Sequence, residues 1–212
     1  DIIGWEVPVL TDHYGHLVIE DCIKLAQTVD PFNLAWLEDM VPWMYSDQIL
    51  RLKNSCTTPI CTGEDIYLKE GFSPLIETGG IAVVHPDVLT AGGILESKKI
   101  ADLATEKGIA TAFHMAESPI GALAAVHTAA ACEQVLAVEF HSADVDWWDD
   151  LVEGTAKPLV QDGYIEVPDT PGLGISDLND EVIAAHVNPD RQEIWAPTTV
   201  WDGEWSMDRQ WS

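Results

Sequence analysis

Basic residues are scarce in this sequence. Among 212 residues there are 10 Lys and Arg against 36 Asp and Glu, which gives a formal net charge of −26. A surface with that charge repels nucleic acid and anionic membranes, so we expect neither as a partner. The acidic residues are spread among apolar ones without long runs of like charge, which favours a folded domain over an acidic disordered tail. The composition is typical of halophilic proteins, in which salt screens the self-repulsion.

Long apolar runs and a targeting segment are also missing. No stretch approaches the roughly 18 consecutive apolar residues that a membrane span requires. The start, Asp1–Trp5, has no initiator Met, basic segment or cleavage site, so we expect no signal peptide and a chain that begins within a longer protein. Cys22, Cys56, Cys61 and Cys132 form no Cys-x-x-Cys pair and no zinc-finger spacing with His. We interpret them as buried, reduced thiols of a cytoplasmic protein.

Short β-type runs alternate with amphipathic helical stretches along most of the chain. Strands that alternate with helices predict an α/β fold with a parallel sheet, either open or closed into a barrel. The length suffices for one sizeable domain with a core. The six β-type runs are Val7–Leu10, Leu34–Leu37, Pro59–Thr62, Ile81–Val84, Ala110–Phe113 and Val135–Val138.

A titratable residue follows each of these runs. The intervals between successive ones are 23 to 27 residues, about the length of one βα unit. In a closed parallel barrel the carboxyl ends of the strands meet at one mouth, whereas an open sheet would spread them along an edge. We therefore predict a TIM-type (β/α) barrel with strands three to eight present and two βα units before residue 1. The six residues are Asp12, Glu38, Glu64, Asp87, His114 and Glu139.

The alternation stops after Glu139. The remainder contains Trp147 and Trp148, a turn-rich segment at 168–174, and a tail with four further Trp residues. A tail so rich in Trp rarely stays in water. We predict a barrel portion at 1–145, with the metal and catalytic site, and a C-terminal extension at 146–212 that packs on the barrel or on a domain outside this chain.

Three carboxylates on successive strand ends suit a hard cation. Asp12, Glu38 and Glu64 offer the oxygen ligands that Mg²⁺ prefers, and the substrate can complete the coordination shell. The alternative is that each carboxylate is simply solvated or caps the next helix. Three carboxylates at the same position relative to successive strands favour the metal site.

The next residues in the series suggest a base. Asp87 and His114 follow consecutive strands at one level, so we expect them to form a hydrogen bond. An Asp on one imidazole nitrogen fixes the tautomer and supports the imidazolium formed by proton abstraction. Glu139 faces the same mouth and could share a proton with a substrate carboxylate as negative charge builds there.

Candidates for a general acid flank the first carboxylate. Tyr14, His13 and His16 lie within a few residues of Asp12, where they could protonate a leaving hydroxyl group. One of the two His residues could instead cap the following helix.

Seven short motifs stand along the chain in the order Trp36–Asp39, Thr62–Asp65, His85–Asp87, Ala91–Ile94, Phe113–His114, Ser118–Gly121 and Pro171–Gly174. Together they resemble a known family, the mandelate racemase and sugar-acid dehydratase branch of the enolase superfamily, over nearly the whole chain. The resemblance implies an N-terminal capping domain and two earlier barrel strands, one of which often carries a catalytic Lys.

The resemblance also implies roles for individual residues. Asp87 and His114 would be the dyad that acts as base, and Glu139 the electrophile near the substrate carboxylate. The muconate-lactonising branch has a Lys where this chain has Asp87, which disfavours that branch. Many family dehydratases place a His two residues after the first ligand, where this chain has Tyr14, so the identity of the acid stays open. The implied magnesium ligands are Asp12, Glu38 and Glu64.

These parts suit abstraction of a proton α to a carboxylate. We predict a lyase, an acid-sugar dehydratase (hydro-lyase) that converts an aldonate to a 2-keto-3-deoxy acid with Mg²⁺. The first alternative is an isomerase, a racemase or epimerase of a 2-hydroxy acid with the same metal site. The second is a non-catalytic acidic binding module or an inactive fragment of a larger enzyme. The expected partners are the sugar-acid substrate, the N-terminal portion of the same protein, and further copies in a homo-oligomer.

Overall fold

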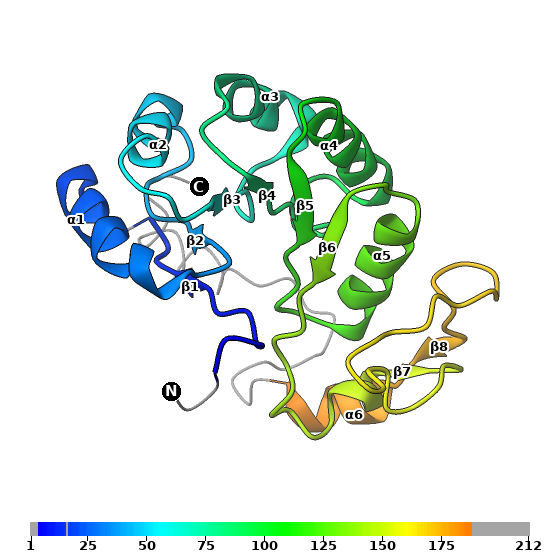
Figure 1. The fold of residues 1–212 in the computed structure, drawn as a ribbon. Helices are drawn as coiled ribbons and strands as arrows, with labels where there is room; N and C mark the ends of the chain where they lie inside the picture. Colours follow the sequence, from blue (N-terminus) through cyan, green and yellow to red (C-terminus); the bar gives the residue numbers. More distant parts are fainter. Residues whose placement is uncertain (1–3, 16, 188–212) are drawn as a thin grey trace.

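The computed structural model describes residues 4–15 and 17–187. Six strands form one parallel sheet in the order β1-β2-β3-β4-β5-β6, and helices cover its outer side, as in a barrel cut open lengthwise (Figure 1). The predicted α/β fold with a parallel, barrel-type sheet is confirmed. The strands are β1 Thr11–Asp12, β2 Leu37–Glu38, β3 Ile60–Thr62, β4 Val83–Val84, β5 Ala110–Phe113 and β6 Val135–Val138.

Two strands have the predicted bounds and four do not. β5 and β6 coincide with their apolar runs, whereas β1 begins only after the predicted strand Val7–Leu10. The apolar run marks where the chain is extended, and Ala35 N does donate to Val9 O at 2.7 Å. The regular ladder begins later, where Thr11 comes into register with Leu37. The predicted strands at 34–37, 59–62 and 81–84 were likewise too early or too long at their start.

The helices alternate with the strands as the sequence predicts. Ser118 caps α5 by accepting a hydrogen bond from Gly121 N at 3.3 Å, and Pro119 occupies the first helical position. None of the helices in the described ranges is long and apolar enough to cross a membrane. The α-helices are α1 Ile19–Val29, α2 Ser46–Lys53, α3 Leu68–Thr78, α4 Ile94–Glu106, α5 Pro119–Ala130 and α6 Asp180–His186, with 3-10 turns η1 Asp30–Phe32 and η2 Trp148–Leu151.

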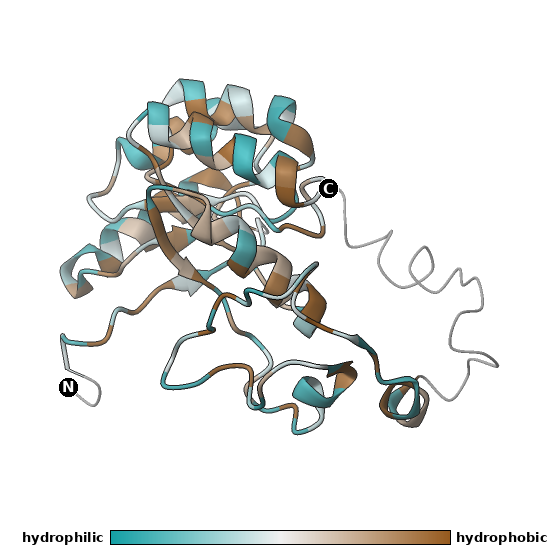
Figure 2. Cartoon of the chain, turned by 90° about the vertical axis from the view of Figure 1, so that its right-hand side faces the viewer, coloured by the Kyte–Doolittle hydropathy of each residue, from teal (hydrophilic) through white to brown (hydrophobic). Residues whose placement is uncertain are grey.

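The main core lies between the sheet and its outer helices. Hydrophilic and hydrophobic residues alternate around these helices (Figure 2), as expected when one side packs and the other meets water. The cluster combines strand residues with helix residues, among them Leu37, Ile60, Val84, Cys22, Leu52, Phe72 and Ile100.

Residues after β6 form a small unit beside α5. β7 Val152–Glu153 and β8 Asp177–Leu178 pair in antiparallel fashion. Trp148 packs in one cluster with Met115 and Leu123, and its Nε1 donates to Glu117 O at 2.9 Å. The part of the predicted extension at 188–212, with its four Trp residues, lies outside the described residues, and the division at residue 145 stays a prediction.

Asp30 ties the end of α1 to the loop before β3. Its carboxylate accepts hydrogen bonds from Thr58 Oγ1 at 2.7 Å, from Thr58 N at 2.9 Å and from Thr57 N at 3.0 Å. Burial works to raise the pKa of this carboxyl, but the hydrogen bonds from Thr58 and Thr57 outweigh it and lower the pKa. The ionised carboxylate therefore stabilises the fold.

We expect Asp30→Ala to lower the free energy of unfolding by about 1–3 kcal/mol, because three donors lose their partner. Urea unfolding at neutral pH measures this, and Asp30→Asn, which keeps one acceptor oxygen, should lose less. Because the folded pKa is depressed, the contribution is present above about pH 4 and is lost as the pH falls through the folded pKa. A difference between Asp30→Ala and the wild type that is the same at neutral pH and below the folded pKa would contradict this.

Candidate active site

The carboxyl ends of the six strands carry the six titratable residues at one end of the sheet. Asp12 and Glu38 end β1 and β2 and are paired in register. Asp87 and His114 form a parallel bridge just beyond β4 and β5. Glu64 lies two residues after β3, and Glu139 follows β6 directly.

Asp87 and His114 form the predicted pair. His114 Nδ1 donates to Asp87 Oδ2 at 2.8 Å. The other oxygen of Asp87 accepts from Leu89 N at 2.6 Å and from Thr90 N at 2.9 Å, so the buried carboxylate is held on both sides. Burial works to raise the Asp87 pKa, but the hydrogen bonds from His114 and Thr90 lower it on balance. An ionised Asp87 fixes the ring with Nε2 as its free nitrogen.

Nε2 of His114 faces the acidic mouth. It lies 3.5 Å from Glu64 Oε2 and 3.6 Å from Glu139 Oε2. Burial alone would lower the His114 pKa, but the hydrogen bond with Asp87 and the charges of Glu64 and Glu139 raise it to about 9. Positive charge bound beside these acids would lower that pKa toward the range where the ring accepts a proton.

Glu38 is anchored from two sides below the mouth. His85 Nδ1 donates to Oε1 at 2.6 Å, and Trp36 Nε1 donates to Oε2 at 2.6 Å. Burial works to raise the Glu38 pKa, but these hydrogen bonds lower it on balance. Glu64 differs, because burial and the neighbouring charges of Asp39 and Asp12 raise its pKa to about 8.

The carboxylates of the three predicted magnesium ligands do not all meet at one point. Within the described ranges, two groups of three residues have their ligand atoms within 4.8 Å of one another, and neither is the set Asp12, Glu38 and Glu64. The Glu38 carboxylate turns toward His85, and the Glu64 carboxylate turns toward His114. The assignment of all three as ligands therefore stays a prediction.

The donor set nevertheless fits a magnesium ion. Each carboxylate has about four lone-pair sites, so the two hydrogen bonds at Glu38 leave acceptor capacity. No ion pair between a Lys or Arg and an acid in the described parts of the chain includes Asp12, Glu38 or Glu64. Burial and the charges of Asp39 and Asp12 raise the pKa of Glu64, and a divalent cation would offset these negative charges.

The candidate acids differ in placement. Tyr14 has a positive φ of 53°, and its backbone N donates to Asp12 Oδ1 at 3.1 Å. The charge of Asp12, partial burial and the charges of Glu64 and Glu139 raise the Tyr14 pKa, so the phenol keeps its proton near the mouth. His13 turns back to Thr11, with Nε2 3.0 Å from Oγ1, and burial lowers its pKa. His16 lies outside the described residues.

The sequence predicts no role for three residues of this site, which are His85, Glu117 and Trp36, although His85 and Trp36 lie in motifs of the family resemblance. His85 contacts Glu38 and also lies edge-on to His114, with ring centroids 5.6 Å apart. Glu117 lies in one group with Asp87 and His114. Alternation along a strand could have found His85, since it stands two residues before Asp87 and so shares its face of the sheet. The same rule relates Trp36 to Glu38.

Gly63 lets the backbone pass close to its neighbours and so positions Glu64 at the mouth. Its φ is 149°, and a Cβ atom there would lie 2.9 Å from Phe72 Cε1 and 3.0 Å from His85 N. A side chain would therefore push β3 away from β4. The glycine keeps Glu64 at the level of His114.

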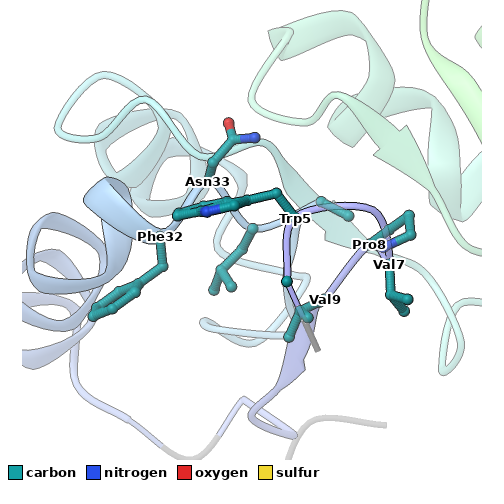
Figure 3. A pocket seen from close by; sticks show the side chains of 9 residues that line it. Trp5, Val7, Pro8, Val9, Phe32 and Asn33 are labelled. Atoms are coloured by element: carbon teal, nitrogen blue, oxygen red, sulfur yellow. The ribbon is translucent and has the colours of Figure 1, made fainter. Parts of the chain in front are cut away.

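A hollow of about 520 Å³ lies at the β1 edge of the sheet, away from the mouth (Figure 3). Apolar side chains dominate its lining, including Trp5, Val7, Pro8, Val9 and Phe32, and no titratable residue lines it. It therefore offers no side chain for acid–base chemistry.

Comparison with known proteins agrees with this geometry. The family model for the enolase C-terminal domain-like family matches residues 1–181. D-xylonate dehydratase of Haloferax volcanii is 40% identical over 187 residues, which cover 88% of this chain and 45% of that protein. D-galactonate dehydratase of Ralstonia nicotianae is 28% identical over 203 residues, covering 92% of this chain and 52% of that protein. The chain thus spans about half the length of the curated relatives it matches.

Solved structures show the same likeness. A mandelate racemase/muconate lactonizing enzyme-like protein from Rubrobacter xylanophilus superposes with a TM-score of 0.84 at 36% identity, over 88% of this chain and 47% of that one. The 3,6-anhydro-D-galactonate cycloisomerase of Zobellia galactanivorans superposes with a TM-score of 0.76 at 31% identity, over 85% of this chain and 50% of that one.

Proposed function

The chain belongs to the enolase C-terminal domain-like family, and on that premise we propose that its protein is a magnesium-dependent sugar-acid dehydratase. The observation that carries the proposal is the His114–Asp87 dyad, whose free nitrogen faces Glu64 and Glu139 at the mouth. The proposed reaction converts an aldonate to a 2-keto-3-deoxy acid. The relatives named D-xylonate and D-galactonate dehydratase support this substrate class.

His114 acts as the base in this proposal. Nε2 accepts the proton from the carbon α to the substrate carboxylate, and Asp87 stabilises the imidazolium through Nδ1. The two backbone hydrogen bonds to Asp87 keep the ring aimed at one point. A positioned base of this kind needs no movement during proton transfer.

Asp12, Glu38 and Glu64 would hold the magnesium ion. When bound, it supplies positive charge to the substrate carboxylate as negative charge builds there. His85 and Trp36 hold Glu38 in place by their hydrogen bonds, which is the role of groups behind a ligand.

Tyr14 is the proposed acid for the leaving β-hydroxyl group. Its raised pKa keeps the phenol protonated, and Asp12, Glu64 and Glu139 all act on it from the mouth. His13 faces Thr11 instead and is the less suited of the two candidates. Glu139, held by a hydrogen bond from Met115 N at 3.1 Å, is proposed to share a proton with the substrate carboxylate.

Reaction in heavy water tests the proposal against a racemase. A dehydratase places deuterium at carbon 3 of the 2-keto-3-deoxy acid, because the enol product takes a solvent proton there. A racemase or epimerase instead places deuterium at carbon 2 of a hydroxy acid that keeps its β-hydroxyl group. Mass spectrometry of the product from the full-length protein separates the two, and the second pattern would overturn the proposal.

We also propose that the protein works in a salt-rich cytoplasm. The four cysteines are all free, which suits a reducing compartment. The net charge of −26 produces self-repulsion that counterions screen.

We expect the thermal unfolding midpoint of the full-length protein to rise between about 0.1 M and 1 M KCl, where the screening length falls from about 10 to 3 Å. A midpoint that falls over this range would contradict the proposal.

A further inference from the structure

A second group of potential ligands lies beneath the mouth. Glu38, Cys61 and His85 are 4%, 0% and 3% exposed, and one ligand atom from each lies within 4.8 Å of the others. The sheet explains the meeting, because Cys61 is in register with both Glu38 and Val83. His85 stands two residues after Val83 and so shares its face.

The three donor atoms differ in kind from those at the mouth. They are one imidazole nitrogen, one sulfur and one carboxylate oxygen, the set that zinc-class cations prefer, whereas magnesium takes oxygen ligands. We propose that Glu38, Cys61 and His85 bind a borderline transition-metal cation such as Zn²⁺. The site is additional to the magnesium site and shares Glu38 with it.

The distances are compatible with such a cation. His85 Nδ1 and Glu38 Oε1 are 2.6 Å apart and share a proton. Zinc bonds of about 2.0–2.1 Å in tetrahedral geometry separate two ligand atoms by roughly 3.3 Å. The metal would replace the proton between these two atoms once they move apart by roughly 0.7 Å, and the ring would then carry its proton on Nε2.

The charge of the ligands and the space beside them also suit a divalent cation. Zinc deprotonates a coordinating thiol. The Cys61 thiolate and the Glu38 carboxylate together then balance the two positive charges, so the buried site is neutral. A cavity of about 120 Å³ borders Glu38 and His85, with Trp36 and Ala112 in its wall. It has room for a water molecule as fourth ligand.

Cobalt spectroscopy on the full-length protein tests the binding. Co²⁺ takes the place of Zn²⁺ and gives a thiolate-to-metal charge-transfer band only when a cysteine sulfur is a ligand. We expect the band in the wild type, its loss when Zn²⁺ is added, and its absence in Cys61→Ala. The matched control is Cys56→Ala, because Cys56 bonds to Leu52 O and Thr58 O outside the group, and it should keep the band.

Two results would overturn the binding. One is a wild type without the band, which needs no variant and so does not depend on how Cys61→Ala folds. The other is a band that persists in Cys61→Ala. Zinc affinity should fall in His85→Gln by more than the roughly 10–100-fold that loss of an outer partner costs, because a direct ligand is removed. An unchanged affinity contradicts the assignment of His85.

The shared ligand has a consequence that rests on the proposed function. Since two divalent cations held by the one carboxylate of Glu38 would repel each other, Zn²⁺ should inhibit dehydration, and excess Mg²⁺ should relieve the inhibition. Inhibition that magnesium does not relieve contradicts the sharing of Glu38. Absence of dehydratase activity would overturn the proposed function but leave the cobalt spectrum as it is, so the two failures are distinguishable.

Discussion

The variant His114→Asn of the full-length protein is expected to dehydrate its sugar acid about 10²–10⁴-fold more slowly than the wild type. Asn can keep a hydrogen bond to Asp87 but has no basic nitrogen in place of Nε2, which faces Glu64 and Glu139. The reduction should fall on kcat, since the α-proton has no acceptor. Steady-state kinetics with saturating magnesium measure it.

The control is His186→Asn, which changes an exposed histidine on α6 whose Nδ1 bonds to Val182 O in the same helix. It should turn over like the wild type. The α-proton of the substrate should also stop exchanging with heavy water in His114→Asn. Turnover within about tenfold of the wild type would mean that another group is the base.

The variant Glu64→Gln should lose the stabilisation that magnesium gives the wild type. A ligand at 100 times its Kd stabilises the folded state by about 2.7 kcal/mol. Gln has almost the same shape as Glu, but it cannot lose a proton to give the negative charge that binds the cation beside Asp39 and Asp12. Urea unfolding with and without Mg²⁺ measures the shift without any assay of activity.

Glu70→Gln is the matched control, since Glu70 lies exposed in the first turn of α3. This variant should keep the full magnesium shift. An equal shift in Glu64→Gln and the wild type would remove Glu64 from the metal site. A shift in none of the three proteins would remove the magnesium site itself.

The architecture was predictable because its signal is periodic. Asp12, Glu38, Glu64, Asp87, His114 and Glu139 recur at the interval of one βα unit, and a parallel sheet places such residues at one end. The His114–Asp87 hydrogen bond followed from two neighbouring strands at one level.

Features that depend on the exact register between strands, or on the sign of the backbone angle φ, were not predictable. His85 reaches Glu38 across 47 residues and over the intervening strand β3, which no local pattern encodes. Tyr14 has a positive φ, which is uncommon for a residue other than Gly and is not predictable from the residue type. Start positions of short strands such as β1 depend on where pairing becomes regular, and apolarity alone does not mark that point.

The most direct test is turnover of a panel of aldonates, D-xylonate and D-galactonate among them, by the full-length protein with and without Mg²⁺. We predict release of a 2-keto-3-deoxy acid from at least one of them, abolished when the magnesium is removed and restored when it is returned. Release that is equally fast after exhaustive removal of divalent cations would contradict the metal-dependent mechanism. No release from any aldonate, with α-proton exchange of an intact hydroxy acid in its place, would contradict the dehydratase and favour a racemase.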